Sequence, residues 1–302
     1  MRKTPSFGDA ATLRPEEYRL LRDLFAERTG LHFGPDARFT LERRLRDRLT
    51  LLKLSSFAEY YHYLRFGPQA SVEWDEAIDR LTTHETYFFR EDRQLRAFHL
   101  EVLPLLQGLS GPRRRLAVWS AGCATGEEAY TIAILVHSSG LFPVDGPEES
   151  RWEVRVYGTD ISRRCVAAAR RGVYGDGSFR VLAPELRRAF FRQQQDGSHV
   201  VTSIRALCHF GQMNILEEDR SRFFGGVDAI FCRNVLIYFD ARGRKAAIEA
   251  LYERLNPGGV LLLGHSESLL NVSTAFELLH LRDDLVYRKP LSAHDRGSMR
   301  PL

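Results

Sequence analysis

The sequence lacks the marks of several large protein classes. Among its 302 residues are only four cysteines, Cys123, Cys165, Cys208 and Cys232, and none of them forms a CxxC pair. No histidine stands at zinc-ligand spacing from them, so the sequence predicts reduced thiols and no metal site. No apolar run reaches the length of a membrane span, and residues 1–11 contain no apolar signal-peptide core. We therefore expect a cytoplasmic protein that does not insert into a membrane.

The sequence also lacks a strong charge imbalance and the common phosphate-binding motifs. The formal net charge is +4 at pH 7, which permits an acidic partner but does not require nucleic acid. No GxxxxGK[ST] loop is present to hold a triphosphate, and no GxGxxG is present to mark a standard dinucleotide site. Hydrophobic residues make up 44% of the chain and charged residues 27%, which is typical of a globular protein.

Apolar residues in the first third of the chain recur at helical spacing. A first helix is predicted from Pro15, a residue that favours the first helical position, to Gly30, which favours a helix end. Further amphipathic patterns follow at 41–52, 57–64 and 74–81. We therefore predict an all-α domain over residues 1–84.

The pattern changes to alternating strands and helices after about residue 115. Apolar runs of strand length are separated by amphipathic stretches, which is typical of a parallel sheet covered on both faces. The strand-length runs are 116–121, 154–157, 227–231 and 260–263, and the helical stretches are 127–137, 163–171 and 242–255. Residues 276–279 and 285–287 are expected to form a closing antiparallel pair. We predict an α/β domain over residues 85–290.

One stretch interrupts this alternation and is predicted to be an insertion, at about 173–207. It contains a helical piece at 184–191, a polar turn at 193–198 and a β-like run at 200–204. The polar segment 291–302 is expected to be a disordered tail.

Small and acidic residues follow the first two predicted strands. The first strand ends in a turn that contains Gly122 and Gly126, where the backbone can approach a ligand closely. The second strand ends at Asp160, whose carboxylate can accept hydrogen bonds from ribose hydroxyls. Taken singly, these features also fit a tight turn and a helix cap. Together they favour a cofactor that contains a nucleoside.

Polar residues also follow the third and fourth strands. Here the third strand is one that precedes Asn214 and the run 227–231, and that run is the fourth strand, which Arg233 and Asn234 follow. The carboxyl ends of strands are where open α/β sheets bind ligands. A buried arginine is costly unless it has partners, so structural pairing within the protein remains an alternative. Tyr238 follows four residues later, and a single tyrosine of this kind also fits a core position.

Four segments together resemble the CheR family of chemotaxis receptor glutamate methyltransferases. They are TTHETYFFRE at 82–91, WSAGCATGEEAY at 119–130, FCRNVLIYF at 231–239 and GHSES at 264–268. The resemblance implies an all-α domain followed by a Rossmann-like methyltransferase domain with a small inserted β-subdomain. It also implies transfer of a methyl group from S-adenosylmethionine to receptor glutamates, which leaves S-adenosylhomocysteine.

The resemblance assigns roles to individual residues. It implies that Thr86 and Arg90 contact the cofactor, that Glu128 and Asp160 hold its amino-acid or ribose end, and that Asn214 and Ile215 surround the adenine. His84, Gly122, Arg233 and Asn234 complete the expected cofactor site, and Arg90, Arg233 and Tyr238 are the candidate catalytic residues. The sequence leaves open whether Glu127 or Glu128 makes the contact.

Two departures from the family pattern modify these expectations. His84 stands where the family usually has asparagine, and its imidazole is bulkier than an amide, so cofactor affinity is expected to differ. The insertion has a single glycine in 193–198, whereas members that bind a receptor's C-terminal pentapeptide have a Gly-rich loop there. We expect this protein not to require that tether.

The expected partners are the acidic helices of chemoreceptor cytoplasmic domains. Residues 38–53 carry six basic and two acidic side chains, and such a helix would steer an acidic surface towards the site. A solvated charged face is the simpler alternative. The basic run 113–115 is compatible with an alternative function, a methyltransferase that acts on nucleic acid or a small molecule. No target-base motif supports nucleic acid as the substrate. A non-catalytic module that binds the cofactor or a receptor is the other alternative.

Overall fold

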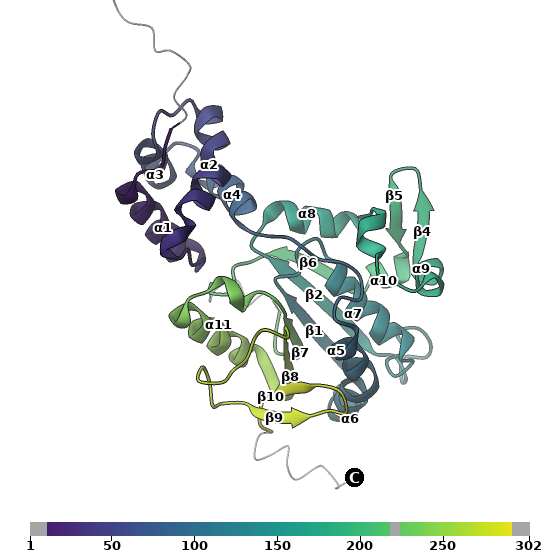
Figure 1. Cartoon of the computed structure of the whole chain (residues 1–302). Helices are drawn as coiled ribbons and strands as arrows, with labels where there is room; N and C mark the ends of the chain where they lie inside the picture. Colours follow the sequence, from purple (N-terminus) through teal and green to yellow (C-terminus); the bar gives the residue numbers. More distant parts are fainter. Residues whose placement is uncertain (1–10, 218–223, 292–302) are drawn as a thin grey trace, which may run out of the picture. The chain divides into compact units, whose positions relative to one another are not determined.

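The computed structural model describes residues 11–217 and 224–291 (Figure 1). The chain divides into two compact units, one from Met1 to Thr83 and one from His84 to Leu302. The predicted disordered tail, 291–302, lies outside the described residues apart from its first residue. Within the described ranges, no helix combines the length and the apolar character needed to cross a membrane.

The first unit is helical, as predicted. Its elements are α1 (Pro15–Thr29), η1 (Pro35–Ala37), α2 (Arg38–Leu52), α3 (Phe57–Phe66) and α4 (Ala70–Leu81). Gly30 ends α1 with a φ of 77°, a left-handed conformation that glycine adopts without strain. Leu21, Phe25, Leu45 and Tyr60 are fully buried and form part of the core.

Most basic side chains of α2 are used within this unit. Arg48 pairs with the buried Glu73 at 2.6 Å, and Glu73 also accepts a hydrogen bond from the Tyr60 hydroxyl at 2.7 Å. Arg44 donates to the carbonyl oxygens of two residues at the end of α4, Arg46 pairs with Glu42, and Arg38 donates to the carbonyl oxygen of Leu13. Arg43 and Lys53 are exposed.

The second unit begins with a helical segment that the sequence analysis did not predict. It consists of α5 (Asp92–Ala97), a π-helical turn η2 (Phe98–Val102), α6 (Leu103–Ser110) and the short η3 (Gly111–Arg113). The π-helical turn shifts the helical phase, and Pro104 at the start of α6 resembles a helix breaker in the sequence. These two features obscured the regular spacing of the apolar residues.

A seven-stranded sheet forms the centre of the second unit. Its strands are β1 (Arg115–Ala121), β2 (Glu153–Asp160), β6 (Cys208–Gln212), β7 (Val227–Cys232), β8 (Leu255–Leu263), β9 (Glu277–His280) and β10 (Leu285–Arg288). They lie in the order β6-β2-β1-β7-β8-β10-β9. The first five are parallel, and β10 pairs antiparallel to both β8 and β9, which confirms the expected closing pair. The chain order reverses between β1 and β7, which makes that edge a topological switch point.

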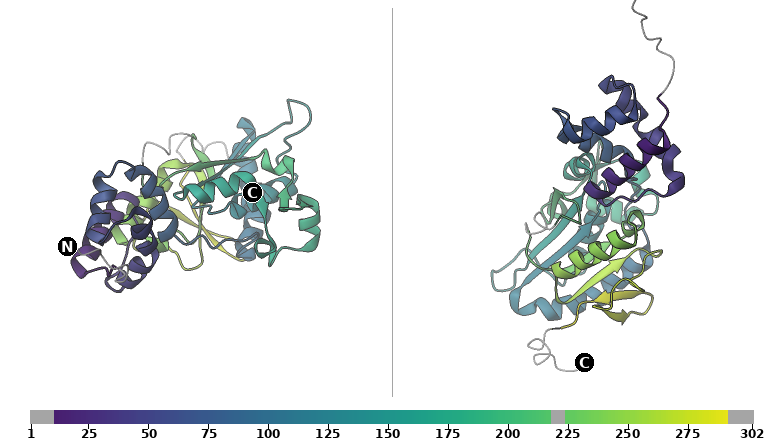
Figure 2. Two further views of the ribbon diagram at one scale, coloured as in Figure 1. Left: turned by 90° about the horizontal axis from the view of Figure 1, so that it is seen from above. Right: turned by 90° about the vertical axis from the view of Figure 1, so that its left-hand side faces the viewer.

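Helices cover both faces of this sheet (Figures 1 and 2). Alternate residues of β1 face opposite sides: Leu116 and Val118 belong to the core beneath α5, α6 and α7 (Glu127–Ser138), and Trp119 belongs to the core beneath α11 (Ala241–Arg254). The other helical elements are α8 (Arg163–Arg171) and the 3-10 turn η6 (Leu236–Tyr238). The expected α/β fold class is confirmed.

The predicted insertion contains a separate three-stranded antiparallel sheet. Its elements are β3 (Val173–Tyr174), η4 (Asp176–Phe179), α9 (Pro184–Phe190), β4 (Phe191–Gln194), β5 (Gly197–Val200) and α10 (Thr202–Arg205). The polar turn predicted at 193–198 is wrong in extent, because most of it belongs to the paired strands β4 and β5. The β-like run predicted at 200–204 is also wrong after Val200. The chain turns into α10 there, and the N–H of Arg205 bonds to the carbonyl of Val201.

Candidate functional site

The turn between β1 and α7, at the switch point, uses backbone conformations that favour glycine. Gly122 has a φ of 80° and Gly126 a φ of 98°, and both are conformations that favour glycine. The N–H groups of Gly122 and Cys123 both donate to the carbonyl oxygen of Thr159 at 2.8 Å, which ties the turn to β2. A Cβ atom at Gly122 would lie 2.5 Å from Cγ2 of Val235. Glycine is therefore required both by conformation and by space.

Asp160 joins this turn to the end of β2. It is buried, and its carboxylate accepts hydrogen bonds from the N–H of Ala124 at 2.8 Å and of Ser162 at 2.9 Å. The N-cap of α8 is Ser162, whose hydroxyl oxygen accepts from the N–H of Cys165 at 3.0 Å. Helix capping, the alternative considered for Asp160, is thus performed by Ser162.

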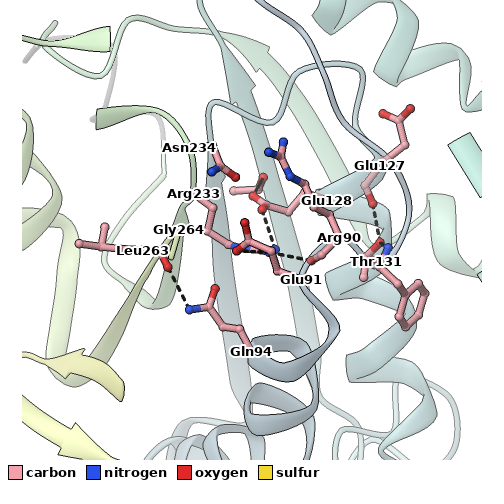
Figure 3. Close-up of polar contacts among 12 residues, drawn as sticks. Arg90, Glu91, Gln94, Glu127, Glu128, Thr131, Arg233, Asn234, Leu263 and Gly264 are labelled. Atoms are coloured by element: carbon pink, nitrogen blue, oxygen red, sulfur yellow. Dashed lines mark hydrogen bonds and ion pairs between the residues drawn. The ribbon is translucent and has the colours of Figure 1, made fainter. Parts of the chain in front are cut away.

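Arg233 forms a buried ion triad with two glutamates (Figure 3). Its guanidinium lies 2.9 Å from the carboxylate of Glu91 and 3.2 Å from that of Glu128, and it donates to the carbonyl oxygen of Arg90 at 2.6 Å. The Arg233 side chain is 2% exposed. Its Nε–H is buried and has no hydrogen-bond partner within the described part of the chain. Glu91, which the sequence analysis did not single out, completes the triad from a left-handed backbone conformation with φ 60°.

Glu127 and Glu128, between which the sequence analysis did not decide, have different hydrogen-bond partners in the structure. Glu128 accepts from the Ser120 hydroxyl at 2.7 Å and pairs with Arg233. Burial raises the pKa of Glu128, and the charge of Arg233 opposes that rise. Glu127 instead accepts from the hydroxyls of Thr125 and Ser178, and burial also raises its pKa. Glu128 is therefore the glutamate that belongs to the site at the strand ends.

Glu267 is a structural centre of the site that the sequence analysis did not predict. Its carboxylate accepts four backbone N–H groups, from Gly264 at 2.8 Å, Asn234 at 2.8 Å, Val235 at 2.9 Å and Leu236 at 2.7 Å. These bonds fix the loop after β7, in which Asn234 has a φ of 60°. The sequence signal for Glu267 was its place in the segment 264–268, one of the four that carry the family resemblance, and that signal did not indicate a role for the residue.

The segment that contains His84, Thr86 and Arg90 runs without regular secondary structure beside the strand ends. It is fixed further along, where the N–H of Phe88 donates to the carbonyl of Ser178 at 2.9 Å. The guanidinium of Arg90 donates to the carbonyl of Glu85 at 2.8 Å, so it folds back on its own segment. A ring nitrogen of His84 lies within 4.8 Å of a carboxylate oxygen of Asp160.

The remaining predicted residues lie on two neighbouring strand ends. Asn214 and Ile215 follow β6 and are buried, and the adjacent Met213 N–H donates to the carbonyl of Asp160 at 3.0 Å. Tyr238 ends η6, four residues after Asn234, and is half-buried. The structure thus links Arg90 with Arg233 directly, and it brings Asn214 and Ile215 to Asp160. No contact links the Tyr238 side chain to these groups among the described residues.

Two of the four cysteines belong to the strand ends. Burial raises the pKa of the Cys123 thiol in the β1–α7 turn, and it raises the pKa of the Cys232 thiol at the end of β7. Both thiols are therefore held in the neutral, unreactive form.

The sheet order, the switch-point turn and the polar side chains gathered at the strand ends together define a methyltransferase of the Rossmann-like class. Family models support the finer assignment: "CheR methyltransferase, SAM binding domain" matches residues 84–284, and "CheR methyltransferase, all-alpha domain" matches residues 16–82. The chain belongs to the CheR methyltransferase family. Its cofactor is S-adenosylmethionine, and both the expected family and the expected cofactor are confirmed.

Relatives match over nearly the whole chain. Chemotaxis protein methyltransferase 2 of Vibrio cholerae is 38% identical over 273 residues, which cover 89% of this chain and 91% of that protein. The chemotaxis protein methyltransferase of Salmonella typhimurium is 34% identical and covers 88% of each chain. Among solved structures, the N-methyltransferase NodS from Bradyrhizobium japonicum covers 65% of this chain and 87% of its own, with 16% identity and a TM-score of 0.36. That last likeness is too weak to carry an argument.

Proposed function

We propose that this enzyme transfers the methyl group of S-adenosylmethionine to glutamate side chains of chemoreceptor cytoplasmic domains. The products are a glutamate methyl ester and S-adenosylhomocysteine. The observation that carries the proposal is the fixed set of Asp160, Glu128, Arg233 and Asn234 at the switch point of a CheR-family domain. The proposed substrate also places the enzyme in the cytoplasm.

The residues at the strand ends fit this cofactor. Two backbone N–H bonds orient the Asp160 carboxylate at the end of β2, and a carboxylate in this position can accept hydrogen bonds from ribose hydroxyls. Gly122 allows the β1–α7 turn to keep its φ of 80° while Val235 packs against it, which holds this turn at the strand ends. The Nε–H of Arg233, which has no partner among residues 11–217 and 224–291, offers a donor, and Glu128 offers an acceptor for an ammonium group. Asn214 and Ile215 lie beside Asp160, in position to surround the adenine.

Catalysis by this site requires alignment and no general base. A glutamate carboxylate has an ordinary pKa of about 4.3 and is already ionised at neutral pH. The bound cofactor supplies an electrophilic methyl group on a good leaving group. Holding the carboxylate in line with that group contributes about 7–11 kcal/mol in the best-oriented intramolecular reactions. The contribution of this chain is therefore the position of the side chains around the incoming carboxylate.

The three candidate catalytic residues take different parts in this proposal. Arg233 is committed to Glu91 and Glu128, so we assign it the positioning of the cofactor rather than of the substrate. Arg90 is half-buried, and within the described residues its guanidinium contacts only its own segment, at the carbonyl of Glu85 and the ring of Tyr87, which leaves donors for the substrate carboxylate. Tyr238 has a half-buried side chain close to Asn234 in sequence, and its hydroxyl is the proposed donor that orients the attacking oxygen.

A methyl-transfer assay with receptor-rich membranes tests the proposed reaction. Label from S-adenosylmethionine should appear on receptor protein and should be released by mild base, as expected of a glutamyl ester. Label on nucleic acid or a small molecule would identify another substrate class. Bound but untransferred cofactor would identify a non-catalytic module.

Substitution of Tyr238 by phenylalanine tests the orienting role. Tyr238→Phe should lower the rate of transfer about tenfold, the loss expected from one hydrogen bond of about 1.4 kcal/mol, and should leave cofactor affinity unchanged. The assay is repeated with Tyr252→Phe, a tyrosine on α11, as the matched control. Wild-type turnover in Tyr238→Phe would remove the residue from the mechanism.

We also propose that α2 binds the acidic helices of the receptor. Since Arg38, Arg44, Arg46 and Arg48 make contacts within the helical unit, the exposed Arg43 is the residue that can be changed without breaking those contacts. Arg43→Glu should raise the KM for receptor several-fold at low salt and leave cofactor affinity unchanged. Arg19→Glu, an exposed reversal on α1, is the control. Equal effects of the two reversals would count against docking through α2.

We propose that docking does not require a receptor C-terminal pentapeptide. The β4–β5 turn is closed by side-chain bonds, from Ser198 to Gln193 at 2.7 Å and between His199 and Asp196 at 2.7 Å. This turn stands at the position where the family members that bind the pentapeptide have a Gly-rich loop. Receptors with and without the pentapeptide should therefore be methylated at the same rate. A rate that falls when the pentapeptide is removed would contradict this.

A further inference from the structure

Three side chains with metal-binding atoms meet beside the cofactor site. They are His84, Asp160 and Cys165. A ring nitrogen of His84, a carboxylate oxygen of Asp160 and Sγ of Cys165 lie within 4.8 Å of one another. The residues come from three separate segments: the strand-free stretch before Phe88, the end of β2 and the first turn of α8. The spacing of cysteines and histidines along the sequence could not reveal this cluster.

Two of the three side chains are held in place by the fold. Asp160 is fixed by the N–H groups of Ala124 and Ser162, and Cys165 is 3% exposed in the first turn of α8, where Ser162 accepts its N–H. His84 is half-buried in a segment without regular structure. The three side chains therefore come from the end of a strand, the first turn of a helix and one irregular segment.

The donor set and its geometry suit a zinc-like ion. Imidazole nitrogen, carboxylate oxygen and thiolate sulfur are the usual ligands of Zn²⁺, at about 2.0–2.3 Å from the metal. Tetrahedral ligation at such lengths brings ligand atoms to about 3.5 Å from one another, so the cluster needs a contraction of roughly 1 Å. A hard ion such as Mg²⁺ prefers oxygen ligands and does not suit this set.

We propose that His84, Asp160 and Cys165 bind one Zn²⁺-class ion, and that this ion and S-adenosylmethionine exclude each other. On binding, Cys165 loses its thiol proton to solvent and contributes a thiolate, and a water molecule takes the fourth position. The exclusion rests on the proposed role of Asp160 in holding the ribose, because the same carboxylate serves both ligands. Metal binding itself does not depend on that role.

Cobalt serves as a spectroscopic probe of the metal site. Titration of Co²⁺ into protein dialysed free of cofactor should reach one equivalent and should produce a thiolate-to-cobalt charge-transfer band in the near ultraviolet. His84→Asn and Cys165→Ser should each weaken binding at least about tenfold, and Cys165→Ser should abolish the band. His280→Asn and Cys208→Ser are the matched controls, since neither residue belongs to the cluster. If the wild-type protein shows no such band, the proposed metal site is wrong, whatever the variants show.

Competition is then measured by calorimetry. With Zn²⁺ at ten times its dissociation constant, the apparent dissociation constant of S-adenosylmethionine should rise about tenfold, as mutual exclusion requires. Mg²⁺ at the same concentration should have no effect, and His84→Asn should remove the zinc effect. Cobalt binding with a thiolate band but no competition would overturn the exclusion and, with it, the ribose role of Asp160. Methyl transfer to receptor in the metal-free enzyme is measured separately, so failure here is distinguishable from failure of the proposed reaction.

Discussion

Buried arginine–glutamate pairs occur in both units of this protein, but they lie in different surroundings. In the helical unit, Arg48 pairs with the buried Glu73 and with the exposed Glu76, and a tyrosine hydroxyl satisfies the Glu73 carboxylate. In the α/β unit, Arg233 pairs with two glutamates and still has a buried Nε–H without a partner in the described chain. The first group connects helices of one bundle. The second lies at the strand ends where this fold binds ligands, so the same pairing chemistry serves packing in one unit and a binding site in the other.

The largest expected effect comes from removing the arginine of each group. Arg233→Met leaves the carboxylates of Glu91 and Glu128, each 16% exposed, without their counter-ion, which should cost about 3–5 kcal/mol of unfolding free energy. Arg48→Met should cost about 2–3 kcal/mol, because Glu73 keeps its bond to Tyr60 and Arg48 is partly exposed. Urea unfolding measures the loss of unfolding free energy, and hydrogen exchange shows which of the two units is destabilised.

Cofactor affinity separates the two variants more sharply than stability does. At a temperature where both are folded, calorimetry should detect no binding of S-adenosylmethionine to Arg233→Met and wild-type affinity in Arg48→Met. If both variants bound the cofactor equally well, the triad at Arg233 would be a packing element like its counterpart in the helical unit.

Glycines with positive φ offer a second, smaller contrast. Gly140→Ala should cost about 1 kcal/mol, because its φ is 67° but nothing lies within 4 Å of the added Cβ. Gly122→Ala should cost about 2–4 kcal/mol, because the added Cβ also overlaps Val235. The double variant Gly122→Ala with Val235→Ala should recover part of the difference in urea unfolding. No recovery would show that the overlap is relieved in some other way.

The helices of the bundle and the outline of the sheet were predictable from sequence because they depend on local periodicity. Leu21 and Phe25 on one helix, or the apolar runs of β1 and β7, need no knowledge of distant partners. The π-helical turn at 98–102 breaks the same periodicity, so the helical segment around it was missed. Asp160, Arg233 and Asn234 were predictable as site candidates because each follows a strand.

The partners of those candidates were not predictable, because they come from distant segments. Glu91 reaches Arg233 and Glu267 reaches the loop after β7 only through the assembled sheet. Both residues lie in segments that carry the family resemblance, but nothing local in the sequence identifies their partners. The same holds for the basic helix. Its charge was plain in the sequence, but the use of Arg44 and Arg48 within the bundle was not.

The smallest expected effects on stability come from changing glutamates that accept hydrogen bonds from backbone N–H groups, one in each unit. In the helical unit, Glu17 accepts from the N–H of Arg14 at 2.9 Å and of Ala58 at 3.0 Å. In the α/β unit, Glu267 accepts from four N–H groups. Glutamine keeps the shape of each side chain but replaces one acceptor oxygen by a donor, so Glu267→Gln should cost about 1–3 kcal/mol and Glu17→Gln about 1 kcal/mol.

The two substitutions should differ in their effect on the cofactor. Glu267 fixes the loop that contains Asn234 in a left-handed conformation, so Glu267→Gln should weaken S-adenosylmethionine binding several-fold in calorimetry even where the fold persists. Glu17→Gln should leave that affinity unchanged, because its bonds are confined to the helical unit. Unchanged affinity in Glu267→Gln would mean that the loop keeps its conformation without the carboxylate. The left-handed backbone at Asn234 would then be stabilised by its packing against the β1–α7 turn, where Val235 faces Gly122.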